Sequence, residues 1–148
     1  MIYCMLNSHL MYLGLTKYEI HKKAGVRIQT IYSLCNDENR YISFDVTDKL
    51  CKALGCHPGS LYVYLRDGEM PKIDFKYYDF DEYTLRFALG DYLKNRGDKY
   101  RFSKATGIRA LTISNFCKNN TTGVSRKVLS KICKVLDRDV YDLFRYEK

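Results

Sequence analysis

The chain contains the same sequence pattern twice, and this internal repeat constrains the fold more than any other feature. Shifting the 148-residue sequence by 82 positions places residues 22–35 over 104–117, with Lys, Gly, Arg, Thr, Ile and Cys identical in register. With no gap, 16 of the 48 pairs between residues 17–64 and 99–146 are identical. A repeat of this length indicates a tandem duplication of one domain.

Each copy is typical of two short helices joined by a glycine turn. In the first copy, Ile20 lies five positions before Gly25, and Val26 follows it directly. These spacings place apolar side chains on the inner faces of two helices that meet at a sharp angle. Glycine suits the corner because it adopts positive φ without strain. The residues left facing outward on the second helix are Ile28, Gln29, Tyr32 and Ser33 in the first copy and Ala110, Leu111, Ser114 and Asn115 in the second, with Arg27 and Arg109 at its start.

Each copy resembles the helix-turn-helix domain of the lambda-repressor/Cro-like (XRE) family of DNA-binding regulators, over nearly the whole repeat. Besides the glycine turn, the resemblance rests on the Gly-Leu-Thr-Lys lead-in at 14–17, the helix caps Ser43 and Ser125, and the closing pairs at 54–55 and 136–137. It implies an all-α protein made of two tandem five-helix domains.

We expect a first domain at residues 1–66, a linker at 67–80 and a second domain at 81–148. The linker breaks the helical period, and its four aromatic residues predict that it lies against one or both domains. Helices are expected at 2–13, 17–23, 27–34, 44–54 and 60–65, and at 81–95, 99–106, 109–116, 126–136 and 140–146.

Charge and cysteine usage agree with a DNA-binding protein of the cytoplasm. The net charge of +8 and the pI near 9.1 favour a polyanionic partner, because Lys and Arg release counterions from phosphates. Residues 81–148 carry net +7 and residues 1–66 only +3, so if only one copy binds DNA, the second repeat is expected to be that copy. Four of the six cysteines fall at equivalent apolar helix positions, which favours buried free thiols in a reducing compartment. The N-terminal sequence indicates neither a signal peptide nor a membrane span.

The resemblance also implies roles for individual residues. Lys17 and Lys99 fall where the family contacts phosphates, and the outward residues of the second helix fall where it contacts bases. Gln29 and Asn115 can pair with an adenine edge, and Ile28 or Ala110 can touch a thymine methyl. Arg27 and Arg109 can reach a guanine or a phosphate, and Lys118 is the remaining expected DNA-binding position.

The sequence also departs from the family. Ile28 and Ala110 occupy a position where the family often has Gln, and Leu111 is also apolar, so neither helix is rich in donors to base edges. The alternative is therefore a protein-interaction module, antitoxin-like or anti-repressor-like, in which one or both repeats bind protein. For the lysines and arginine on the outer helix faces, a solvated surface remains open beside phosphate contact: Lys22, Lys104, Arg126, Lys127, Lys131 and Lys134.

No enzymatic motif is present in the sequence. His9, His21 and His57 all lie in the first repeat, and none recurs in the second. The spacing of Cys51, Cys56 and His57 does not match a zinc site, and no cofactor fingerprint occurs. We therefore expect a non-enzymatic transcriptional regulator, acting as a repressor on double-stranded DNA without metal or cofactor. It would act as a homodimer or as an intramolecular pseudo-dimer.

Overall fold

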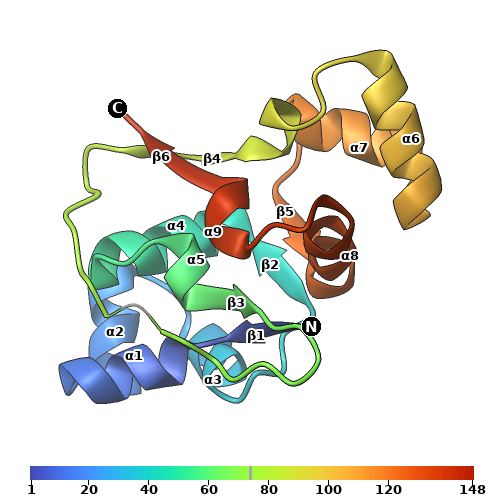
Figure 1. Ribbon diagram of the computed structural model, residues 1–148. Coiled ribbons are helices and arrows are strands. Elements are labelled where there is room, and N and C mark those ends of the chain that lie inside the picture. Colours follow the sequence, from blue (N-terminus) through green and yellow to red (C-terminus); the bar gives the residue numbers. More distant parts are fainter. Residues whose placement is uncertain (74) are drawn as a thin grey trace.

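The computed structural model describes residues 1–73 and 75–148, so Asp74 of the expected linker lies outside the described residues. The elements of the first repeat are β1 (Ile2–Cys4), α1 (Leu6–Leu13), α2 (Lys17–Ala24), α3 (Ile28–Cys35), β2 (Tyr41–Ser43), α4 (Phe44–Leu54), α5 (Pro58–Leu61) and β3 (Tyr62–Tyr64). Those of the second are β4 (Thr84–Phe87), the 3-10 helix η1 (Ala88–Asp91), α6 (Arg96–Thr106), α7 (Ala110–Cys117), β5 (Gly123–Ser125), α8 (Arg126–Leu136), α9 (Val140–Leu143) and β6 (Phe144–Glu147). Every element of the second repeat except α6 begins 82 residues after its counterpart in the first. Figure 1 shows the arrangement of these elements.

Local signals in the sequence account for most helix ends. Thr16 caps α2 in a capping box with Glu19, and Ser43 and Ser125 cap α4 and α8 by accepting a hydrogen bond from the backbone N–H three residues on. Gly25 and Gly107 end α2 and α6 with φ of 69° and 74°. The helices expected at 17–23, 44–54 and 126–136 are confirmed, within one residue at each end.

The expectation of an all-α protein is confirmed only in part: the chain is mainly helical, but short strands flank the helices of both repeats. In the first repeat β1 pairs antiparallel with β3, and in the second β4 pairs antiparallel with β6. The first helix therefore begins at Leu6 rather than at residue 2. The last helices end at Leu61 and Leu143, because the residues that follow pair with a strand instead of continuing the helix.

The helix expected at residues 81–95 is also wrong. Thr84–Phe87 form β4, and only the 3-10 helix η1 follows it. Gly90 packs so closely under α7 that a Cβ there would lie 2.9 Å from the carbonyl oxygen of Cys117. Among the described residues the first repeat therefore has five α-helices, whereas the second has four and a 3-10 helix.

A ribbon of β2 and β5 joins the two repeats. The strands run antiparallel, and Ile42 pairs with Val124, its own counterpart at the offset of 82. Just outside the strands, Phe44 N–H donates to Thr122 O at 2.9 Å, and Arg126 N–H donates to Arg40 O at 2.8 Å. Each of these contacts is the equivalent of the other, so a pseudo-two-fold axis passes between Ile42 and Val124.

A second contact on the same axis joins α5 and α9. Gly59 of α5 lies against Tyr141, its counterpart on α9, and a Cβ at position 59 would be 2.4 Å from the Tyr141 Cα. The His57 ring lies 4.1 Å, centroid to centroid, from the Tyr141 ring. Only a glycine allows the two short helices to approach this closely.

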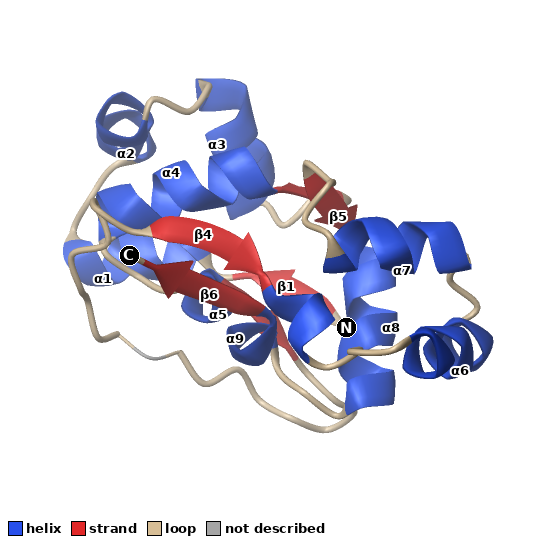
Figure 2. Ribbon diagram, turned by 90° about the horizontal axis from the view of Figure 1, so that it is seen from above, coloured by secondary structure: helices blue, strands red, loops and turns tan. Residues whose placement is uncertain are grey.

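The ribbon lies between α3 and α7 in both views of the molecule (Figures 1 and 2). Seen from above in Figure 2, α3, β5 and α7 follow one side of the molecule, while α5, α9 and the C-terminus lie away from that side. The second helices of the two helix-turn-helix units, α3 and α7, are thus presented together.

The segment between the repeats packs against both of them, as expected from its aromatic residues. Phe75 stacks on Tyr12 of α1 at 4.1 Å, and Phe80 stacks on Tyr146 of β6 at 4.4 Å. Tyr77 completes the contact by hydrogen bonding through its hydroxyl to His9 Nδ1 at 3.1 Å.

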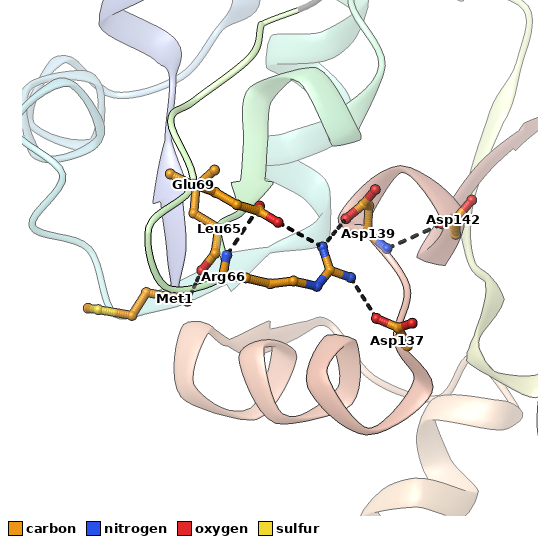
Figure 3. Close-up of polar contacts among 7 residues, drawn as sticks. All are labelled: Met1, Leu65, Arg66, Glu69, Asp137, Asp139 and Asp142. Atoms are coloured by element: carbon orange, nitrogen blue, oxygen red, sulfur yellow. Dashed lines mark hydrogen bonds and ion pairs between the residues drawn. The ribbon is translucent and has the colours of Figure 1, made fainter.

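Arg66, which follows β3, adds an ionic contact between the repeats (Figure 3). Its guanidinium lies 2.9 Å from Asp137 Oδ1 and 3.4 Å from Asp139 Oδ1, both in the turn between α8 and α9. Glu69, in the segment between the repeats, lies 3.6 Å from the same guanidinium. This contact has no equivalent on the other side of the axis, where Gly55 and His57 replace the two aspartates.

Candidate nucleic-acid interface

The helix-turn-helix corner is fixed in the same way in both repeats. Val26 and Ile108, which follow the turn glycines, are buried. The carbonyl of Val26 lies 2.5 Å from His21 Nδ1, and the carbonyl of Ile108 accepts a hydrogen bond from Ser103 Oγ at 2.6 Å. Positions 21 and 103 are equivalent, so each second helix is held at its start by a side chain from the preceding helix.

In the first repeat, α3 buries Ile31 and Leu34 and turns its other face outward. Of the residues expected to meet DNA, three are exposed and two are half-buried beside them: exposed Arg27, Gln29 and Tyr32, and half-buried Ile28 and Ser33. The expected outward face of this helix is therefore confirmed as accessible surface.

In the second repeat, α7 buries Ile113 and Phe116 in the same register. Its outward residues divide in the same way: exposed Arg109, Ala110, Leu111 and Lys118, and half-buried Ser114 and Asn115. Leu111 is 72% exposed, which is unusual for a leucine and leaves its side chain free to contact a partner.

The two expected phosphate-binding lysines are placed differently. Lys17 is the first residue of α2, and its ammonium lies 4.9 Å from the centre of the Tyr32 ring on α3, in a cation–π contact. Lys99 lies one turn inside α6, because that helix begins at Arg96 after the Asn95 cap. In the second repeat, the helix start is thus formed by residues 96–98, where the amide of Asp98 already donates to Asn95 Oδ1 at 2.8 Å.

The surface around both recognition helices is free of acidic groups from those helices, since neither α3 nor α7 contains Asp or Glu. Within the described part of the chain, no ion pair or side-chain hydrogen bond engages Arg27, Arg109 or Lys118. By contrast, Lys49 and Lys52 on α4 are each paired with an aspartate four residues earlier. The cations beside the recognition helices are therefore available to an external anion.

The structure adds a pair of residues that the sequence reasoning missed. Tyr18 on α2 and Tyr100 on α6 are each 60% exposed, and each carries a lysine ammonium over its ring. Lys22 lies 5.6 Å from the first ring and Lys104 lies 5.5 Å from the second. The signal was present in the sequence, because both pairs are identical at the offset of 82.

The six cysteines are buried or half-buried. All six cysteines are free, and burial raises the pKa of Cys4 and of Cys133 to about 12, which keeps both thiols protonated. In residues 1–73 and 75–148, no group of three or more His, Cys, Asp or Glu side chains has the arrangement to hold a metal ion. No helix in this part of the chain is long and apolar enough to cross a membrane.

Comparison with known families identifies the class of protein that this geometry defines. The Cro/C1-type HTH DNA-binding domain matches residues 8–67 and matches again at residues 93–148. The two matches cover most of the chain, so the protein belongs to this family and carries its domain twice. Comparisons with curated proteins and with solved structures gave no match. The tandem helix-turn-helix architecture predicted from the repeat is thus confirmed.

Proposed function

We propose that the protein is a cytoplasmic transcriptional repressor that places α3 and α7 in the major groove of double-stranded DNA. The observation that carries the proposal is the pairing of two helix-turn-helix units about one axis, with both recognition helices beside the β2–β5 ribbon. Half-sites about one helical turn apart are expected for two such helices. The chain is then an intramolecular pseudo-dimer of domains 1–66 and 81–148, joined by the linker 67–80.

We assign DNA-binding roles by position on this surface. The residues that face bases are Ile28, Gln29, Tyr32 and Ser33 in the first repeat and Ala110, Leu111, Ser114 and Asn115 in the second. Those that contact the backbone are Lys17, Arg27, Lys99, Arg109 and Lys118, with the Tyr18–Lys22 and Tyr100–Lys104 pairs at the outer edges. The free cations and the absence of acids on α3 and α7 support this assignment.

One observation favours a second candidate function. Leu111 is 72% exposed at the first turn of α7, and the Tyr32 ring is exposed on α3. Apolar side chains in these positions also suit the binding of a protein partner, so that one repeat would act as an antitoxin-like or anti-repressor-like module.

The test is binding of the whole protein to a random-sequence duplex across a salt series of about 50 to 200 mM. Two double variants are compared with wild type: Lys17→Ala/Arg27→Ala and Lys99→Ala/Arg109→Ala. Lys49→Ala/Lys52→Ala is the matched control, because it removes the same charge from residues that are already paired with aspartates. Each double variant is expected to weaken binding and to flatten the slope of log affinity against log salt by about 2, whereas the control changes little.

The outcomes separate the two candidate functions. Loss in both variants supports docking of both repeats on DNA. Loss in the repeat-two variant alone assigns protein binding or another role to α3. If wild type binds weakly and without salt dependence, the protein does not act on DNA and the protein-interaction function replaces the proposal.

A further inference from the structure

The pairing of the two repeats determines what kind of DNA site the chain can bind. This inference rests on the proposed function. We infer that the chain binds as a single copy and reads a non-palindromic site whose two half-sites differ and are inverted with respect to one another. The symmetry of the ribbon, the use of its contact surfaces and the chemistry of the two recognition helices carry this inference.

The ribbon determines the orientation of the half-sites. A tandem repeat in sequence can present its two domains head to tail, which would match direct repeats in DNA. Here, however, β2 and β5 are equivalent strands that pair antiparallel, with Ile42 opposite Val124. The helices α3 and α7 are therefore related by a two-fold rotation, and the base sequences that they meet run in opposite directions.

The contacts on the axis are already used within one chain. The edge of β2 is occupied by β5, and the face of α5 is filled by Tyr141 against Gly59. In a dimer of two chains these same surfaces would have to face a second copy. The intramolecular contact therefore satisfies the geometry that a two-fold site requires, and one chain per site follows.

The interface also favours pairing of a first repeat with a second repeat over pairing of two identical repeats. Phe44 reaches across the axis to the rings of Phe87 and Phe144, at 5.3 and 5.6 Å. Its counterpart Arg126 reaches the other way and pairs with Asp37. A pairing of two first repeats would bring Phe44 to the acidic site that receives Arg126, so unlike repeats pair in preference to like ones.

The recognition helices differ at all four positions expected to face bases, although both begin after an arginine and bury residues at the same two positions. Ile31 and Ile113 are identical in the core, whereas the four outward pairs are Ile28/Ala110, Gln29/Leu111, Tyr32/Ser114 and Ser33/Asn115. Gln29 offers an amide to an adenine edge one turn before the place where Asn115 offers one in the other half. Two helices with different side chains at these positions read different bases, so the site has a direction.

The experiment is selection of tight-binding duplexes from a random pool with the full chain, followed by affinity and stoichiometry measurements. The selected site is compared with three constructed duplexes of the same spacing: a palindrome of each half-site, and a direct repeat that holds both. We expect the selected site to be inverted and asymmetric, each constructed duplex to bind at least about tenfold more weakly, and sedimentation to give one chain per duplex.

Single variants assign each half to its helix. Gln29→Ala is expected to relax base preference in one half of the selected site only, and Asn115→Ala in the other half only. A palindrome or a direct repeat that binds as tightly as the selected site, or two chains on one duplex, would overturn the inference. Salt-dependent binding without any selected sequence would also overturn it but would leave the proposed function intact, whereas no binding at all removes both.

Discussion

Phe44 and Arg126 occupy the same position in the two repeats, yet they fasten the repeats together by different chemistry. Both are the first residue of a helix that follows the ribbon, and both extend into the opposite repeat. Phe44 packs on aromatic rings, while the Arg126 guanidinium pairs with Asp37 and Asn39 and donates to Ile2 O at 3.3 Å. The same backbone arrangement is thus stabilised by an apolar contact at Phe44 and by an ionic contact at Arg126.

The partners of these two residues differ in a matched way. Asp37, which receives Arg126, has Asn119 as its counterpart on the side that receives Phe44. Both residues have positive φ and both accept a hydrogen bond from the backbone of a neighbouring strand, so their structural role is the same. Only the side that holds the cation carries the carboxylate. In each half of the interface, the residue that crosses the axis and its partner have therefore changed together. The aromatic half and the ionic half can be tested separately.

The largest effect is expected from Phe44→Arg. This change places a guanidinium beside Phe87 and Phe144, where position 119 offers a neutral amide, and a charge without a partner at this half-buried apolar position costs about 3–4 kcal/mol. Urea unfolding measures the loss. Adding Asn119→Asp recreates the pair found on the other side and is expected to recover part of the stability. If the double variant is no more stable than Phe44→Arg, the two sides are not equivalent in geometry.

The next largest effect is expected from Gly59→Val. A side chain at this position meets the backbone of Tyr141, which cannot move away as a flexible side chain would, so we expect a loss of about 3 kcal/mol. Gly97→Ala is the control, because its Cβ would only approach the Asn95 side chain at 3.3 Å. Thermal unfolding of the control should match wild type or exceed it slightly. Equal stability of Gly59→Val and wild type would show that α5 and α9 are not in contact.

Acidification is expected to weaken the α5–α9 contact through His57. Only the first repeat contributes such a group, because the counterpart of His57 in the second repeat is Asp139. Burial lowers the pKa of His57 to about 4, against the smaller opposing effects of a backbone hydrogen bond at Phe144 and the charge of Asp142. A depressed folded-state pKa means that the stability contribution is present above pH 6.5 and is lost as the pH falls toward 4. We expect a loss of about 2–3 kcal/mol from this group.

The matched variant for this pH dependence is His57→Asn, which keeps an acceptor for the Gly59 amide. Its free energy of unfolding should vary less between pH 6.5 and 4 than that of wild type. The variation that remains is assigned to His9, whose pKa is also lowered by burial. A variant with the full wild-type pH dependence would show that His57 is protonated equally easily in the folded and unfolded states.

The smallest effect is expected from Arg126→Met, which keeps the aliphatic stem and removes the guanidinium. The Arg126 side chain is only 14% exposed, but Asp37 is 35% exposed, so water can solvate the carboxylate that is left. We expect a loss of about 1–2 kcal/mol, less than for a fully buried pair. The free energy of unfolding of Arg126→Lys should lie between those of wild type and Arg126→Met. A loss as large as that of Phe44→Arg would mean that the ionic side, rather than the aromatic side, holds the repeats together.

The helix-turn-helix units could be predicted from the sequence because their signals are local. Gly25 and Gly107, the caps Ser43 and Ser125, and the apolar spacing each act over one or two helical turns. The strands could not be predicted in this way, since β1 and β2 are three residues long and are stabilised by partners far along the chain.

The second repeat shows the same limit at its start. A helix was predicted at residues 81–95, but pairing with β6 and the close approach of Gly90 to α7 determine their structure. Lys99 was predicted at a helix start but lies inside α6, because Asn95 caps the helix at an earlier position. The outward positions on α3 and α7 were predicted correctly as a surface, whereas their roles in DNA binding remain proposals.

Docking of the repeats can be measured through the backbone amides of Phe44 and Arg126. The first N–H groups of a helix have no partner within that helix, so these two amides are hydrogen-bonded only because the other repeat supplies Thr122 O and Arg40 O. In hydrogen exchange of the whole protein, both should exchange at least about 100-fold more slowly than the amide of Lys17, which also begins a helix but has no strand beside it. If Phe44 and Arg126 exchange as fast as Lys17, the repeats do not pair through the ribbon and the pseudo-dimer is wrong.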